Sequence, residues 1–243
     1  TEDAHGKNIA IGHSALSSLD AGAEGLNVVV GDIAGQNMTT AQENVMVGSS
    51  AGGQYTTGSR NVGIGRQSLT TDTLGSRSTA VGYNTLGSQN FTTSTNTNNV
   101  AVGYVAGLNV TTGIDNTLLG AYAGDAITDA DYNTAVGKEA LSSDTVGSRS
   151  VAIGYQALKE QNMGTAQNSL NTAVGTLAGK EITTGTSNTL IGASAGDALT
   201  DANLNTAVGQ AALSSDVKGT RSTALGMGAL QNQNFTTALA SNN

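Results

Sequence analysis

The sequence predicts an all-β protein, a parallel β-solenoid or β-roll of about thirteen coils. A five-residue pattern resembling Asn-Thr-Ala-Val-Gly occurs thirteen times, proline is absent, and many of the 33 glycines recur at fixed spacing. A short fixed period is typical of solenoids, because one coil buries its apolar side only by stacking on its neighbours. Proline would interrupt such a stack, since each coil must donate backbone N–H groups to the next. The patterns occupy residues 8–12, 27–31, 44–48, 61–65, 78–82, 99–103, 116–120, 133–137, 150–154, 171–175, 188–192, 205–209 and 222–226.

The glycines that close these patterns reveal a second, longer repeat. From one closing glycine to the next, the residue number rises by 19, 17, 17, 17, 21, 17, 17, 17, 21, 17, 17 and 17. Three coils of length 17 and one of length 21 therefore form a set, and sets recur with a period of 72. We expect residues 1–243 to form a single solenoid array and to be a fragment of a longer fibre. The array divides into a partial set and three full sets, over residues 1–26, 27–98, 99–170 and 171–242.

Each pattern predicts a short strand whose side chains alternate between two faces. One face carries a branched apolar residue and a Thr or Val, such as Val136 and Thr134, and the other carries Ala and Asn, such as Ala135 and Asn133. We expect the branched apolar face to pack into the coil interior and the small-residue face to pack against a close neighbour. The closing glycine, here Gly137, fits a tight reversal that needs positive φ or a close backbone approach.

Two further columns of the repeat have predicted roles. The Asn column has two interpretations: a ladder of stacked side-chain amides, or a turn residue that starts each strand. After each closing glycine we expect a second short strand. The fourth residue after the closing glycine is Gly in the first two coils of a set and Leu in the last two, as in Gly124 and Leu141.

Acidic and basic residues recur together on the outer connections. Asp72 and Arg77 have equivalents in the next two sets, at Asp144–Arg149 and Asp216–Arg221. We expect a solvated ion pair across each turn, worth about 0–1 kcal/mol, with ligand binding as the alternative. Asp125, Asp129, Asp131, Asp197 and Asp201 form acidic loops for which the alternatives are solvation and calcium binding. Calcium requires six to eight oxygen ligands, and each loop supplies two or three carboxylates.

Composition excludes several classes of function. The formal charge of −8 and the scattered basic residues argue against binding to nucleic acid. Cysteine is absent, so disulfides and cysteine-ligated metals are excluded. No apolar run reaches the roughly 18 residues that span a bilayer, so we expect no membrane insertion. The two histidines, His5 and His13, lie at one end, and we expect no catalytic triad, no enzymatic activity and no cofactor.

The long connection after every fourth coil is the strongest candidate for ligand contact. It reads Gln-Asn-Phe-Thr-Thr at residues 89–93 and 233–237, and Gln-Asn-Met-Gly-Thr at 161–165. An exposed apolar tip flanked by amides would suit contact with a sugar or protein. Alternatively, the Phe or Met side chain folds back over the roll or fills a gap between chains. The predicted contact residues are Gln89, Asn90, Phe91, Gln161, Asn162, Met163, Gln233, Asn234 and Phe235.

The repeats Asn-Thr-Ala-Val-Gly-x-x-Ala-Leu and Ser-Val-Ala-Ile-Gly-Tyr-Gln-Ala-Leu resemble those of bacteriophage tail fibres. They are also similar to the head repeats of YadA-like trimeric autotransporter adhesins, whose coils are shorter. The resemblance covers nearly the whole chain and implies a left-handed β-roll and a homotrimer. It further implies a structural or adhesive role in host attachment, through a cell-surface glycan or protein receptor, on a virion tail fibre or a cell surface.

Three other functions remain as alternatives to a phage fibre: the head of a bacterial adhesin, a passive extracellular filament, and ice binding. Flanking sequence would separate fibre from adhesin, because only the adhesin carries a membrane-anchor barrel. Ice binding would rest on threonine pairs such as residues 56–57 and 183–184, which do not form a uniform rank along the repeat.

Overall fold

The computed structural model describes residues 7–20, 25–237 and 239–240. Within these ranges the chain forms nineteen short β-strands and no helix, as the sequence predicts. Thirteen strands have three residues and coincide with the thirteen repeated patterns. They are β1 (Ile9–Ile11), β2 (Val28–Val30), β3 (Val45–Val47), β4 (Val62–Ile64), β6 (Thr79–Val81), β8 (Val100–Val102), β9 (Thr117–Leu119), β10 (Thr134–Val136), β12 (Val151–Ile153), β14 (Thr172–Val174), β15 (Thr189–Ile191), β16 (Thr206–Val208) and β18 (Thr223–Leu225).

Six further strands of two residues form three small parallel sheets beside the long connections. In each sheet a two-residue strand in the coil before a long connection pairs with the two-residue strand that follows that connection. The pairs are β5 (Gly75–Ser76) with β7 (Thr95–Asn96), β11 (Gly147–Ser148) with β13 (Gln167–Asn168), and β17 (Gly219–Thr220) with β19 (Leu239–Ala240).

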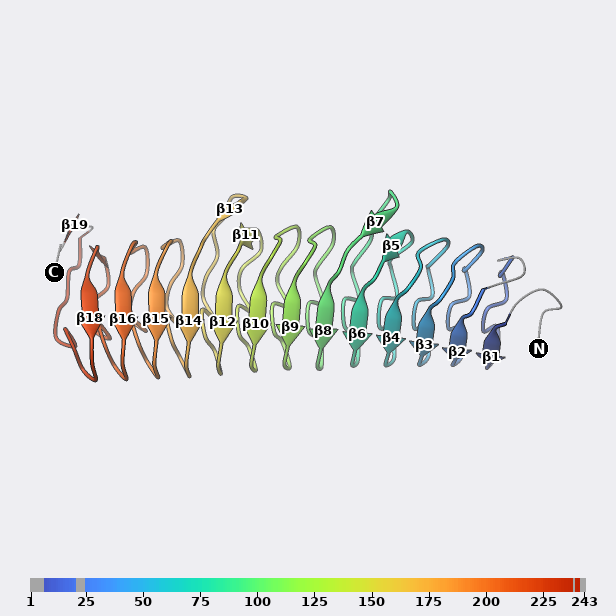
Figure 1. The fold of residues 1–243 in the computed structure, drawn as a ribbon, viewed down its shortest axis with the longest axis horizontal. Helices are drawn as coiled ribbons and strands as arrows, with labels where there is room; N and C mark the ends of the chain where they lie inside the picture. The colour runs from blue at the N-terminus through green and yellow to red at the C-terminus, as the bar shows by residue number, and fades with distance from the viewer. Residues whose placement is uncertain (1–6, 21–24, 238, 241–243) are drawn as a thin grey trace. The chain divides into compact units, whose positions relative to one another are not determined.

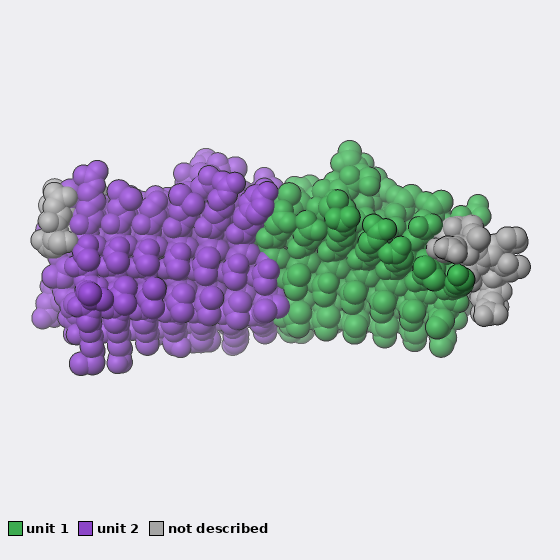
Figure 2. Space-filling model, in the orientation of Figure 1, with its two compact units in different colours: residues 1–116 green, residues 117–243 purple. Residues whose placement is uncertain are grey.

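The chain divides into two compact units, residues 1–116 and residues 117–243 (Figure 2). In the first unit β1, β2, β3, β4, β6 and β8 follow one another as hydrogen-bonded neighbours, and in the second β9, β10, β12, β14, β15, β16 and β18 do so (Figure 1). The pairs are parallel and in register, so that Thr134 lies beside Thr117 on one side and Val151 on the other. These pairings confirm a parallel β-solenoid of about thirteen turns.

The faces of the three-residue strands are the reverse of the expected arrangement. The central residue points inward and is buried, as at Ala135 and Leu118, whereas the flanking Thr134 and Val136 are partly exposed. The predicted inward packing of the branched apolar column is therefore wrong. The interior is narrow because the Asn side chains share it with the strand centres, so only small residues or single larger side chains fit there.

The closing glycines allow the coils to stack closely, as expected. Gly120 has a φ of +139°, and a Cβ added to it would lie 2.5 Å from the carbonyl oxygen of Gly137 in the next coil. A side chain cannot occupy that space, so both the positive φ and the close approach require glycine. The same geometry recurs at Gly137, whose Cβ would lie 2.5 Å from the oxygen of Gly154.

Two columns of side chains share the space inside the coils: the central residues of the three-residue strands and the fourth residues after the closing glycines. Where the strand centre is large, as at Leu118, the fourth residue after the closing glycine is Gly124, and a Cβ there would lie 2.7 Å from Leu118 Cδ2. Where the strand centre is Ala135, the equivalent position is Leu141, which is fully buried. In the first coil of the third set the strand centre is Ala173, and the crowding side chain comes from the next coil: a Cβ on Gly179 would lie 2.7 Å from Leu190 Cδ1. The predicted alternation of Gly and Leu therefore reflects packing within and between coils, although the segment that carries it, such as residues 121–126, is a turn and not the expected second strand.

The Asn column forms a ladder of stacked side-chain amides. Asn188 Nδ2 donates to Asn171 Oδ1 at 3.1 Å and to the Ala202 carbonyl at 2.8 Å. Its own Oδ1 accepts from the backbone N–H and the side-chain amide of Asn205, at 3.0 and 3.1 Å. Each buried amide is thus satisfied by the coils before and after it, which confirms the ladder interpretation.

Candidate functional site

The structure places the nine predicted contact residues in different environments. Phe91 and Met163 are buried, with 6% and 4% of their surface exposed, and Phe235 is half-buried. These side chains fold back over the solenoid instead of forming an exposed tip. Gln89 and Gln161 are fully buried, Gln233 and Asn90 are half-buried, and Asn162 and Asn234 are exposed.

Gln89 belongs to a buried polar network that bridges a gap in the Asn ladder. Ser78 occupies the ladder position where ten of the thirteen coils have Asn, and the Gln89 amide fills the space that this shorter side chain leaves. Gln89 Nε2 donates to Ser78 Oγ at 2.9 Å and to Asp72 Oδ2 at 2.6 Å, while its Oε1 accepts from Asn99 Nδ2 at 2.9 Å. The long connection therefore begins with an amide that continues the ladder.

Asp72 joins the long connection to the preceding coil from inside the solenoid. Its Oδ1 accepts backbone N–H bonds from Gly75 and Phe91, both at 3.1 Å. The Tyr55 hydroxyl donates to Asp72 Oδ2 at 3.0 Å, and burial together with the Asp72 charge raises the pKa of Tyr55 well above its usual value. A buried carboxylate is stable here because four donors compensate for its lost hydration.

The same network recurs in the other two sets, which corrects the expected ion pairs. Asp144 is fully buried and accepts bonds from Gln161 and from the backbone of Gly147, and Asp216 is likewise buried and bonded to Gln233. The arginines five residues later are exposed. Among the described residues, the ion pairs found do not join these aspartates to those arginines. A carboxylate inside the coil cannot reach an arginine on its outer turn.

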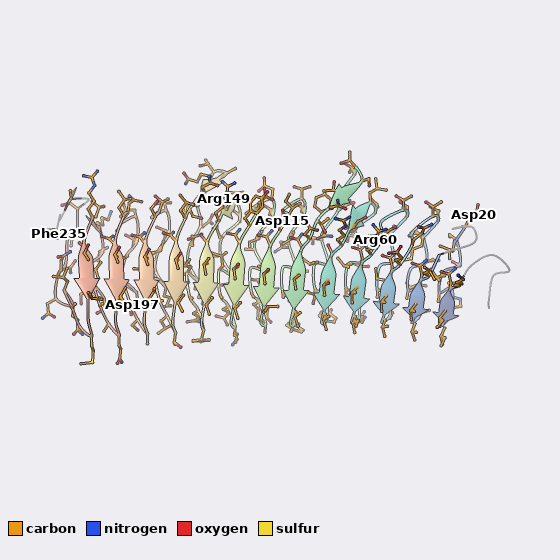
Figure 3. The ribbon with its side chains drawn as sticks, viewed as in Figure 1. Asp20, Arg60, Asp115, Arg149, Asp197 and Phe235 are labelled. Atoms are coloured by element: carbon orange, nitrogen blue, oxygen red, sulfur yellow. The ribbon has the colours of Figure 1, made fainter. Side chains whose placement is uncertain are left out.

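Arg149 lies beside the second long connection. Its guanidinium donates to Asn168 Oδ1 at 2.8 Å and lies 5.2 Å from the centre of the Tyr132 ring. Figure 3 shows Arg149 above the strands, on the side of the view where the small sheet of β11 and β13 lies.

The outward-facing residues of the three-residue strands form a surface that we call the outer strand face. In the first unit eleven of its twelve positions are Ile or Val, the exception being Thr79. In the second unit Thr alternates with Val, Ile or Leu in most strands, as in Thr189 and Ile191. No position of this face is charged in the thirteen strands, although the chain has 10 basic and 18 acidic residues.

A hollow of about 260 Å³ lies on the second unit, and we call it the Tyr122 hollow. It is lined by Tyr122, Asp125, Glu139, Ser142 and Lys159. All five side chains follow closing glycines, at the second or fifth position of three successive coils. The stacking of these coils therefore brings an aromatic ring, two carboxyl groups, a hydroxyl and an ammonium together.

The two carboxyl groups of the hollow have opposite electrostatic environments. Burial raises the pKa of Asp125 to about 6, against a bond from its own backbone N–H, and the nearby charge of Glu139 adds to the rise. Bonds from Gln156, Lys138 and Lys159 lower the pKa of Glu139 to about 2. Glu139 is thus fixed as a carboxylate, by Gln156 at 2.7 Å and by the ammonium groups of Lys138 and Lys159 at 3.2 and 3.3 Å.

Residues proposed for other chemistry do not converge in the described part of the chain. No group of three or more His, Asp or Glu side chains suited to a metal ion occurs there, so the acidic loops form no such cluster. Asp129 is exposed and bonded to Thr128. His13 is exposed and contacts Asp32 at 3.1 Å, and His5 lies outside the described residues.

Comparisons with known proteins add no identification. No family model, curated protein or solved structure matches the chain. In the described ranges no helix has the length and apolar character needed to cross a membrane. The features that bear on function are therefore the two surfaces just described, the outer strand face and the Tyr122 hollow.

Sequence reasoning missed the buried Asp–Gln network and the Tyr122 hollow. A signal for the first was present in the seventh position after each closing glycine. That column reads two apolar residues, then Asp, then Gln in every full set, as in Ile182, Leu199, Asp216 and Gln233. Sharing a column with core residues indicates an inward-facing aspartate.

Proposed function

We propose that this chain is a structural and adhesive fibre segment in which three copies pack side by side. The resemblance of its repeats to those of bacteriophage tail fibres supports a place in a virion fibre, and a role in attachment to a host surface. The single observation that carries the proposal is the uncharged outer strand face. Such a role requires no catalysis and no cofactor.

The chemistry of the outer strand face favours contact with other copies of the chain. An extended apolar surface usually marks an interface, because its exposure to water is unfavourable. The side chains of this face recur once per coil, so a partner must match that spacing along the whole face. An identical chain has the same spacing, and closed symmetric assemblies are the most common solution for identical chains.

The long connections supply the second part of the proposal, contact with a cell-surface glycan or protein. Their buried Gln and Phe or Met residues hold the connection in place, and contact falls to the exposed residues at the tips. In the first set these are Thr92, Thr93 and Ser94, and in the second they are residues 164–168. Loops held by a rigid scaffold are common sites of recognition.

Assembly is tested by measuring the mass of the chain in solution by light scattering. We expect three chains per particle for the wild type. Val136→Glu, which places a charge on the outer strand face, should give monomers with an unchanged circular dichroism spectrum. The matched control, Thr93→Glu, places the same charge on an exposed loop tip and should leave the trimer intact. A wild-type monomer at micromolar concentration would overturn the proposal.

Attachment is tested separately from assembly. Purified trimer should bind to host cells, and substitution of residues 92–94 and Thr165 by alanine should weaken that binding while the mass remains that of a trimer. A trimer that binds no cells would favour the alternative of a passive filament. Attachment to animal or plant tissue in place of bacteria would favour the adhesin head.

A further inference from the structure

The repeat provides an internal control for the Tyr122 hollow. Each lining residue has an equivalent in each of the other two full sets, at positions where the same fold accepts a different side chain. In the first set the equivalents are uncharged: Ser50, Gly53, Gln67, Thr70 and Gly87. In the third set they are Ser194, Asp197, Ala211, Ser214 and Gln231. The solenoid therefore does not require Tyr122, Glu139 or Lys159, and their presence together calls for another explanation.

The polar groups of the hollow are arranged to accept hydrogen bonds. Asp125 Oδ1 is buried, and within the described residues no hydrogen bond reaches it, but the same is true of Asp197 Oδ1 at the equivalent place in the third set. This oxygen is therefore a feature of the repeat position, and the combination of Tyr122, Glu139 and Lys159 is what distinguishes the hollow. Glu139 is held in position by its three partners, and Lys159 remains partly accessible, with 28% of its side chain exposed. The hollow thus offers two carboxyl acceptors, one ammonium donor and one aromatic ring.

Charge and polarity exclude most ligand classes. An anion would be repelled by Asp125 and Glu139, and the Lys159 ammonium is already paired with Glu139 at 3.3 Å. A cation would meet the ammonium groups of Lys138 and Lys159. An apolar ligand would leave buried polar groups without partners. A neutral molecule with several hydroxyl groups satisfies acceptors and donors together, and a saccharide ring also has an apolar face that can lie on Tyr122.

We propose that the Tyr122 hollow binds one neutral sugar residue of a host-surface glycan. Sugar hydroxyls donate to Asp125 and Glu139, a sugar oxygen accepts from Lys159, and the ring lies against Tyr122. The inference rests on the attachment role proposed above and names a ligand class for it. The site shares no residue with the long connections at residues 89–93, 161–165 and 233–237.

The experiment uses the whole chain, residues 1–243, and a panel of methyl glycosides of neutral hexoses, deoxyhexoses and N-acetylhexosamines. Saturation-transfer NMR identifies binders, and calorimetry measures Kd. We expect at least one glycoside to bind with a Kd on the order of 1 mM. The triple variant Tyr122→Ser/Glu139→Ala/Lys159→Gln carries the residues of the third set, so it should fold normally and bind at least tenfold more weakly.

Tyr104→Ser is the matched control, because Tyr104 is an exposed tyrosine outside the hollow, with 51% of its surface exposed. It should bind the glycoside as the wild type does. Failure of every glycoside to bind the wild type, or equal binding by the triple variant, overturns the inference. Stronger binding of methyl glucuronide or methyl glucosaminide than of any neutral glycoside also overturns it.

The mass of the particles in the same sample shows whether the chain is a trimer, so sugar binding and trimer assembly are tested independently. A trimer that binds no glycoside removes the hollow as a sugar site and leaves the fibre segment standing. A monomer whose glycoside binding is lost in the triple variant supports the hollow and removes the trimer.

Discussion

The Gln89 side-chain amide donates a hydrogen bond of 2.6 Å to Asp72 Oδ2, and both side chains are fully buried. The two residues are 17 positions apart and therefore lie in adjacent coils. This pair marks the place in each set of four where the coil lengthens. The inward column seven positions after each closing glycine changes there from apolar residues to Asp and then Gln, and the Asp72 carboxylate also accepts backbone bonds from Gly75 in its own coil and from Phe91 in the longer coil.

Loss of the glutamine amide from the equivalent pair in the second set, Asp144 and Gln161, should destabilise the fold. In the second set Ile127 replaces the tyrosine that bonds the carboxylate in the first, so Asp144 depends more on Gln161. Gln161→Leu leaves that buried carboxylate short of a donor and should lower the free energy of unfolding by about 2–4 kcal/mol. Urea denaturation measures the change. Gln42→Leu, at an exposed glutamine, should change it by less than about 0.5 kcal/mol.

Serine at a position of the Asn ladder should destabilise the fold where no buried glutamine amide fills the space beside it. Asn188 bonds to Asn171, Ala202 and Asn205, and the nearby inward column holds Ile182 and Leu199. We expect Asn188→Ser to cost about 2–4 kcal/mol, although serine is native at equivalent positions in every set. Asn232→Ser, on the exposed surface, is the control. Equal unfolding midpoints for the two variants would contradict the role assigned to glutamine.

Substitution of a closing glycine should be poorly tolerated. Gly120→Ala combines a φ of +139° with a Cβ 2.5 Å from a carbonyl oxygen of the next coil. It should cost about 3 kcal/mol or more, measured as a lower melting temperature. Gly164→Ala provides the comparison, because Gly164 has a φ of +68° and open space around its Cβ position. Its cost should be about 1 kcal/mol, from the backbone conformation alone.

Asp125 should make stability depend on pH. Burial raises its pKa to about 6 in the folded chain, from an ordinary value of 3.8. As pH rises, the unfolded chain therefore releases the Asp125 proton before the folded chain does. The contribution of the protonated Asp125 to the free energy of unfolding is fully present below about pH 4 and is lost as pH rises through 6. Asp125→Asn should gain about 1 kcal/mol relative to the wild type between pH 4 and pH 7, a value reduced for the partial solvent screening of this group. A difference that does not change with pH would contradict this assignment.

The sequence predicted the strands well because stacking in register is possible only when equivalent residues recur at fixed spacing. The positions of Gly120 and Gly137 follow from the same requirement. The faces could not be assigned correctly from residue size. Val136 is larger and more apolar than Ala135, yet Ala135 is inside, because the interior also holds the Asn amides and the side chains of the following segment. The Tyr122 hollow was not predicted because its five residues come from three coils, and three of them, Tyr122, Glu139 and Lys159, depart from the repeat.

The bonds of each Asp–Gln network have consequences for how genes encoding such chains can change. Asp144, Ser150 and Gln161 lie in one set, and each outside partner, such as Asn171, has a counterpart at the same place in the set before or after. Unequal recombination that removes or duplicates one whole set would therefore preserve the Asp–Gln–Asn hydrogen bonds of the network. Loss of a single coil would instead put an aspartate beside the wrong neighbour, so length should vary among related genes in steps of one whole four-coil set.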